Sequence, residues 1–191
     1  DLAALNDDVS EYEEFKHLGF TINKQVKSAT LYACGLGQAV YFLNGKPITD
    51  DVLVTQFTAF DKRVMYNTFD VTNIINNGEN EILAHIGNGF YNDENSAWDF
   101  DKAAWRSHPK LILELVIDYA DQTQDVIVTD STWECAKGPV TFNRMRSGEI
   151  FDGRLVPSSM GGEMSNEVDW HSVMICRGPG GIISENINLP I

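Results

Sequence analysis

The sequence predicts an all-β fold, an antiparallel β-sandwich with one or two short helices. Short runs of apolar, β-branched and aromatic residues recur along the chain between turn signals. Every second residue from Leu111 to Tyr119 is apolar, which is typical of a strand with one buried face. No segment shows the strand–helix–strand alternation of a parallel sheet, and no glycine-rich phosphate loop joins a strand to a helix.

The expected strands begin near Phe15 and occupy a series of short runs at residues 15–22, 28–34, 39–45, 64–71 and 81–91. Within the third run, Asn44 and Gly45 stand between apolar segments. They predict a tight hairpin turn because both residues tolerate the positive φ angles that such a turn requires. A second hairpin is expected over residues 111–130, with its polar turn at 120–124.

One segment, residues 70–80, predicts a short helix of at most about two turns. Asp70 or Thr72 would supply the N-cap, and Gly78 would end the helix in the left-handed conformation.

The length of 191 residues fits one domain of the large β-sandwich type. Residues 1–14 hold six acidic residues and little apolar periodicity, so a linker or flexible entry is expected there. The sandwich is expected over 15–177, followed at 178–191 by an exit segment toward a following domain. Any export signal would lie outside this sequence, because no basic region followed by an apolar stretch occurs at its start.

The formal net charge of −14 disfavours nucleic acid and anionic membrane surfaces as partners, because both carry negative charge. No stretch approaches the roughly 18 apolar residues of a membrane-spanning helix. The three cysteines are odd in number and far apart, which argues against a disulfide framework or a structural zinc site. We expect buried or incidental thiols at Cys34, Cys135 and Cys176.

Catalytic machinery is not predicted. The four histidines lie without metal-ligand spacing, and no serine lies in a nucleophile-elbow motif. Glycoside hydrolysis needs two carboxyl groups at a defined separation across a cleft, and 28 acidic residues offer no pair that stands out.

The most informative segment is 87–109, a long break between strands that combines aromatic residues with carboxylates and amides. Aromatic faces suit the apolar side of a sugar ring, and polar groups suit its hydroxyls or a calcium ion. Alternatively, the tryptophans cap an open end of the sandwich. The sugar interpretation predicts the substrate-binding residues Tyr91, Asn92, Asp93, Asn95, Trp98, Asp99, Trp105 and Arg106.

Two further clusters are candidates. Asp50 and Asp51 follow a turn and are candidate metal ligands, with calcium as the one candidate cofactor and none required; an exposed turn also favours acidic residues without a metal. Residues 144–155 hold three arginines among scarce basic residues. They would form a structural ion-pair network, or pair with a neighbouring domain or a ligand carboxylate.

The order of motifs resembles the N-terminal β-sandwich domain of bacterial α-L-rhamnosidases. The resemblance rests on "LNGKPITDD" at 43–51, "KRVMYNTFDVT" at 62–72, "GEN" at 78–80 and "GNGFY" at 87–91, and continues through "DSTWECAKGP" at 130–139. It covers roughly residues 15–191. The chain departs from the family pattern where Asn88 and Phe90 replace an aspartate and a tryptophan, and where Phe151 replaces a tyrosine.

The resemblance implies a jelly-roll or galactose-binding-like sandwich placed ahead of a catalytic helical barrel that carries the acid and base for inverting hydrolysis of terminal α-L-rhamnose. The expected role is a non-catalytic sugar-binding or substrate-positioning domain, with a rhamnose-containing carbohydrate and the catalytic domain as partners. The alternatives are a structural sandwich that braces the barrel, or a free-standing lectin-like domain. A bacterial periplasmic or extracellular location is expected rather than the cytoplasm.

Overall fold

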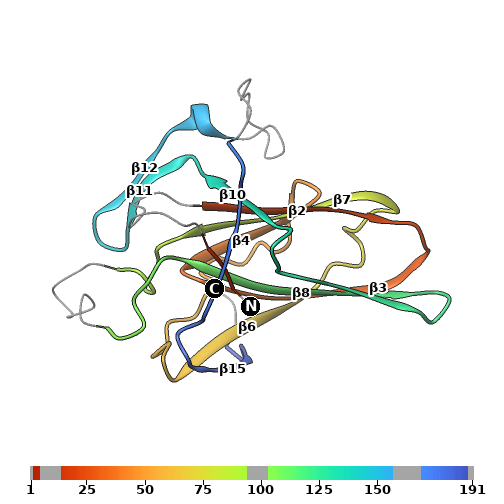
Figure 1. The fold of residues 1–191 in the computed structure, drawn as a ribbon, viewed down its shortest axis with the longest axis horizontal. Helices are drawn as coiled ribbons and strands as arrows, with labels where there is room; N and C mark the ends of the chain where they lie inside the picture. Colours follow the sequence, from red (N-terminus) through yellow and green to blue (C-terminus); the bar gives the residue numbers. More distant parts are fainter. Residues whose placement is uncertain (1, 5–13, 94–102, 157–168, 189–191) are drawn as a thin grey trace.

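The computed structural model describes residues 2–4, 14–93, 103–156 and 169–188. Two β-sheets face each other across the core, as the two layers in Figure 1 show. All strand pairs in the described residues are antiparallel except β6 with β15, which is parallel. The predicted all-β sandwich is therefore confirmed.

Within the described residues, the larger sheet has seven strands in the order β14–β1–β8–β3–β6–β15, with β9 also paired to β8. Their bounds are β1 (Leu2–Ala4), β3 (Val26–Leu36), β6 (Arg63–Asp70), β8 (Lys110–Tyr119), β9 (Gln124–Val128), β14 (Met174–Cys176) and β15 (Ile182–Glu185).

The facing sheet has six strands in the described part of the chain, in the order β13–β10–β2–β7–β4–β5. These are β2 (Glu14–Ile22), β4 (Gln38–Leu43), β5 (Lys46–Pro47), β7 (Gly78–Gly87), β10 (Glu134–Lys137) and β13 (His171–Ser172). A separate hairpin, formed by β11 (Val140–Arg144) and β12 (Gly148–Phe151), projects from the two layers (Figure 1).

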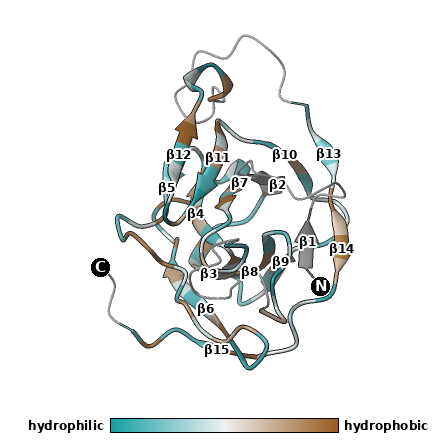
Figure 2. Ribbon diagram, turned by 90° about the vertical axis from the view of Figure 1, so that its left-hand side faces the viewer, coloured by the Kyte–Doolittle hydropathy of each residue, from teal (hydrophilic) through white to brown (hydrophobic). Residues whose placement is uncertain are grey.

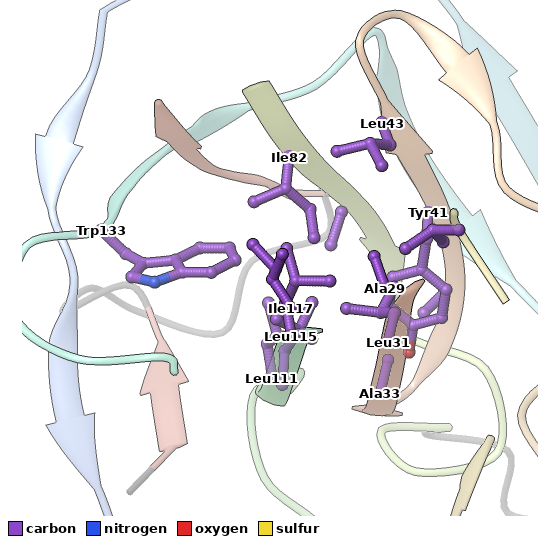
Figure 3. Close-up of a cluster of buried hydrophobic side chains, with 14 of the residues drawn as sticks. Ala29, Leu31, Ala33, Tyr41, Leu43, Ile82, Leu111, Leu115, Ile117 and Trp133 are labelled. Atoms are coloured by element: carbon purple, nitrogen blue, oxygen red, sulfur yellow. The ribbon is translucent and has the colours of Figure 1, made fainter. Parts of the chain in front are cut away.

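The core lies between the two sheets, and every second residue of β8 points into it. Leu111, Leu113, Leu115 and Ile117 are at most 1% exposed. They meet the inner residues of β3, β4 and β7, and Trp133 packs beside them (Figure 3). The Trp133 indole Nε1 donates to the Val128 carbonyl at 3.0 Å, so this buried ring has its polar group satisfied.

The Asn44–Gly45 turn is confirmed. Asn44 has φ of 53° and Gly45 has φ of 71°, the left-handed pair that a two-residue hairpin turn requires. The Asn44 amide also donates to Asn80 Oδ1 at 2.9 Å, which ties the turn to β7.

The predicted helix at 70–80 is wrong. The segment makes one turn, in which the backbone amides of Ile74 and Ile75 donate to the Val71 carbonyl. The Asn80 side chain then bonds both the amide and the carbonyl of Asn76, so those groups do not extend a helix. In the described residues, the assigned helical element is a 3-10 turn at Gly153–Leu155.

The chain ends contribute to the larger sheet. β1 lies within the predicted linker and pairs with β8 and β14, and β15 lies within the predicted exit segment and pairs with β6. Cys34 and Cys135 are buried and Cys176 is partly buried, and none of the three forms a disulfide within the described residues; burial raises the pKa of Cys34 to about 12. Across the described ranges, no helix has the length and apolar character needed to cross a membrane.

Gly37 offers a test of how closely the backbone at this residue approaches the end of β7. Its φ is 133°, and an added Cβ would lie 2.1 Å from the Gly87 carbonyl oxygen, whereas Gly78, with φ of 102°, has open space around it. We expect Gly78→Ala to cost about 1–2 kcal/mol through backbone strain alone. Gly37→Ala should cost about 1–3 kcal/mol more, because the methyl group overpacks the site. Chemical denaturation of both variants measures the difference; equal losses would contradict the close approach.

Candidate functional site

The described part of the 87–109 segment covers one end of the outer face of the larger sheet. Side chains of β3 that point outward, such as Cys34 and Leu36, pack there with Phe60, Tyr91 and Trp105. The Phe60 ring centroid lies 5.3 Å from that of Tyr91 and 6.0 Å from that of Trp105, both in edge-to-face geometry. The segment therefore closes a second, smaller core.

Hydrogen bonds between buried asparagines hold the start of this segment. The Asn88 backbone amide donates to Asn143 Oδ1 at 2.8 Å, and the Asn92 side chain donates to Asn88 Oδ1 at 2.7 Å. Asn143 belongs to β11, so this network also anchors the projecting hairpin to the sandwich.

The predicted sugar-contacting residues divide into three groups. The structure buries Tyr91, Asn92 and Asp93, and only part of Trp105 and Arg106 is exposed. Burial raises the pKa of the Tyr91 hydroxyl to about 12. The remaining three lie outside the described residues: Asn95, Trp98 and Asp99. The described residues of this segment thus serve packing, and their contact with sugar stays a prediction.

Asp50 and Asp51, the predicted metal ligands, are both exposed. The described residues contain no cluster of three or more histidine, cysteine, aspartate or glutamate side chains that could hold a metal ion. Asp51 lines a pocket. Its backbone amide donates to Thr49 Oγ1 at 3.1 Å, which fixes the turn that presents it.

That pocket has a volume of about 200 Å³ and lies between the loop that follows β5, strand β6 and the residues after β15. Pockets that bind drug-sized ligands have volumes of roughly 300–1,000 Å³, so this pocket suits a smaller molecule. We call it the amide pocket, because carboxamides and carboxylates dominate its lining: Asp51, Gln56, Asn67, Glu185, Asn186 and Asn188, with Thr68 and Phe69 from β6.

The polar groups of the amide pocket are held in a connected chain. Asn186 Nδ2 donates to Asn67 Oδ1 at 2.8 Å, and Asn188 Nδ2 donates to Asn186 Oδ1 at 3.0 Å. The side chains of Asp51 and Gln56 have no hydrogen-bond partner among the described residues. The pocket therefore combines preorganised amides with polar groups that are available to a ligand.

Backbone geometry shapes the wall beside Asp51. Leu53 has φ of 54°, in the left-handed region that a branched residue seldom adopts. The sequence predicted Asp51 but missed the other polar residues of the pocket. Its rim is completed by β15, whose pairing with β6 joins residues more than a hundred positions apart and leaves no local signal.

The arginine cluster lies on the projecting hairpin and the turn after it. Arg154 Nε and Nη2 donate to the two carboxylate oxygens of Asp152 at 2.8 and 2.6 Å. These hydrogen bonds lower the pKa of Asp152 to about 2. The guanidinium of Arg144 lies over the Phe142 ring, 5.7 Å from its centroid. One pair of the predicted ion-pair network is present in the structure, between Arg154 and Asp152.

Comparison with known proteins gives consistent matches. A family model described as the α-L-rhamnosidase N-terminal domain matches residues 24–191. An α-L-rhamnosidase from Formosa agariphila is 36% identical over 138 residues, which cover 70% of this chain and 14% of that protein.

Two solved structures also match. An α-L-rhamnosidase from Dictyoglumus thermophilum has a TM-score of 0.79 at 32% identity and covers 92% of this chain and 19% of its own. An α-L-rhamnosidase from Streptomyces avermitilis, complexed with L-rhamnose, has a TM-score of 0.79 at 28% identity and covers 89% of this chain and 16% of its own. The chain spans less than one fifth of the length of each of these three proteins.

Trp105 offers a test of the second core. Its indole Nε1 is buried and has no hydrogen-bond partner in the described residues. Trp105→Ala should lower the free energy of unfolding by about 2–3 kcal/mol, less than the roughly 3–5 kcal/mol for a fully buried aromatic ring. Trp105→Phe should cost under about 1.5 kcal/mol, because it keeps the packing and removes the unpaired donor. If thermal and chemical denaturation find both variants as stable as the parent, the ring does not belong to a packed cluster.

Proposed function

The chain belongs to the α-L-rhamnosidase N-terminal domain family, and on that basis we propose that it is the non-catalytic accessory domain of a longer bacterial α-L-rhamnosidase, in which it binds a sugar unit. The family membership confirms the resemblance carried by the motifs between residues 43 and 91. The hydrolysis of terminal α-L-rhamnose is assigned to the remainder of the longer protein, in keeping with the small share of its relatives that this chain spans.

The amide pocket is the observation that supports sugar binding. A pyranose presents several hydroxyls that both donate and accept hydrogen bonds. Asn and Gln side chains can do both in return, and carboxylates such as Asp51 accept strongly. Phe69, Val52, Leu53 and Val54 line the same pocket and supply apolar surface for C–H groups. The pocket volume of about 200 Å³ suits one ring.

The proposed sugar binding does not require calcium at this site. Ca²⁺ takes six to eight oxygen ligands. The pocket offers the carboxylates of Asp51 and Glu185, but the amide oxygens of Asn67 and Asn186 already accept hydrogen bonds. The described residues therefore fit calcium poorly, and no step of sugar binding is assigned to it.

A second role, bracing the rest of the longer protein, is supported by the projecting hairpin. All four residues of β12 are exposed, and Ile150 and Phe151 are 60% and 57% exposed. Figure 2 shows the hydrophobic colour of β12 at the edge of the molecule. Large apolar side chains that stay exposed on a projecting strand are candidates for a protein contact. The occupant we propose is another domain of the same rhamnosidase.

Sugar binding is tested by titrating L-rhamnose while following amide chemical shifts, with calcium and with a chelator. We expect millimolar binding that shifts signals of the amide pocket, because one ring offers few contacts. Asn186→Ala or Gln56→Ala should weaken binding about five- to tenfold, since each removes hydrogen-bonding groups.

Asn77→Ala is the matched control, because this exposed asparagine lies outside the pocket. Shifts confined to residues 103–109 would return the sugar site to the 87–109 segment. An absence of shifts anywhere, in folded protein, would leave bracing as the better account.

Bracing is tested by replacing Phe151 or Ile150 with serine. In the isolated chain each change should alter the free energy of unfolding by less than about 0.5 kcal/mol, because these side chains face solvent. In a rhamnosidase that contains the remaining domains, the same changes should lower the unfolding temperature, whereas Glu149→Gln on the same strand should not. Calorimetry of both forms measures this. Equal responses of the short and long proteins would contradict the contact.

A further inference from the structure

A groove of about 870 Å³ lies over the part of the larger sheet's outer face that the second core leaves open. Its lining includes Tyr32 from β3, Tyr66 from β6, Glu114 and Val116 from β8, Val128 from β9, and Ile183 from β15. We call it the sheet groove. It has more than four times the volume of the amide pocket, from the two values of about 870 and 200 Å³.

Strand register explains why these side chains share one face. Tyr32 pairs with Glu114, and Glu114 pairs with Val128, so their side chains point the same way from three adjacent strands. β9 and β15 lie on opposite sides of this surface, because β9 pairs with β8 and β15 pairs with β6. Exposed side chains of these two strands lie at its edges: Val128 is 43% exposed and Ile183 is 54% exposed.

The floor of the sheet groove presents aromatic and polar groups together. The rings of Tyr32 and Tyr66 lie edge to face, with centroids 6.0 Å apart and planes at 72°. Both tyrosines are half-buried. Their hydroxyls and the Glu114 carboxylate have no hydrogen-bond partner among the described residues. Rings with free hydroxyls beside a free carboxylate can contact both the C–H face and the hydroxyls of a sugar.

The sheet groove and the amide pocket adjoin along two strands. Tyr66 lines the groove and Thr68 lines the pocket, two positions further along the same face of β6. Ile183 and Glu185 stand in the same relation on β15. Residues two apart on a strand are separated by roughly 7 Å. A linear ligand can therefore occupy both sites at once.

We propose that the sheet groove binds the further rings of a neutral oligosaccharide whose one unit occupies the amide pocket. The inference rests on the proposed function and extends it from a single sugar to a chain. Neutral glycans are specified because Glu114 and Asp130 line the groove and the whole chain carries a net charge of −14, which repels uronate or sulfate groups. An apolar protein surface would leave Glu114 buried without a partner, whereas sugar hydroxyls would satisfy it.

The test compares L-rhamnose with a neutral, rhamnose-terminated oligosaccharide of three or four units, by chemical-shift mapping and calorimetry on this chain. We expect the oligosaccharide to bind about tenfold tighter, as two stacking contacts would provide. Tyr32→Ala should remove this advantage and leave L-rhamnose binding unchanged. Tyr32→Phe, which keeps the ring, should retain most of it. Glu114→Gln should weaken only the oligosaccharide, and Glu149→Gln, the same chemical change outside the groove, should weaken neither.

The outcomes separate the groove from the pocket. If L-rhamnose shifts the amide pocket but the oligosaccharide binds no tighter and leaves Tyr32 and Tyr66 unmoved, the groove proposal fails and the pocket stands. If the oligosaccharide shifts the groove and Asn186→Ala has no effect, the groove stands and the pocket fails. If groove signals shift with protein concentration alone, the surface joins two copies of the chain and the proposal is overturned. Circular dichroism of each variant confirms that it folds.

Discussion

The larger sheet must bury both of its faces at one end and only one face at the other, and this constraint organises the molecule. Its inner face packs against the second sheet, with Leu115 and Leu31 paired and wholly buried. Within the described ranges, its outer face is covered where Phe60, Tyr91 and Trp105 pack on Cys34 and Leu36. The uncovered remainder is the sheet groove. One part of this continuous surface is therefore used for packing, and the other part carries the proposed binding site.

Features that depend on the local sequence could be predicted. The alternation in β8 and the turn at Asn44 and Gly45 are local properties, set by side-chain period and backbone φ, and the structure has both. The helix expected at 70–80 failed because the side chain of Asn80, at the end of the same segment, takes the backbone groups of Asn76. A local contact between a side chain and the backbone therefore replaces the hydrogen bonds that would extend the helix.

The candidate site was less accessible to sequence reasoning. Tyr91 is an aromatic residue in a segment rich in polar groups, and this combination suggested ligand binding. In the structure its ring is buried because it covers an open part of the sheet face. Asp51 was identified because acidic residues after a turn are conspicuous. The other pocket residues Asn67 and Asn186 were missed, since they are far apart in the sequence and meet only when β6 and β15 pair.

The pairing of β15 with β6 has a consequence for how the protein acquires its site. It joins Arg63 to Ile182, a separation of 119 residues (182 minus 63), whereas β8 and β9 close across a few residues. Closing so long a loop costs more chain entropy than closing the β8–β9 hairpin. Residues Glu185 and Asn186 belong to the amide pocket, so the pocket depends on this long-range pairing. A chain shortened by ten residues lacks β15 and would therefore retain its hydrophobic core while losing the pocket.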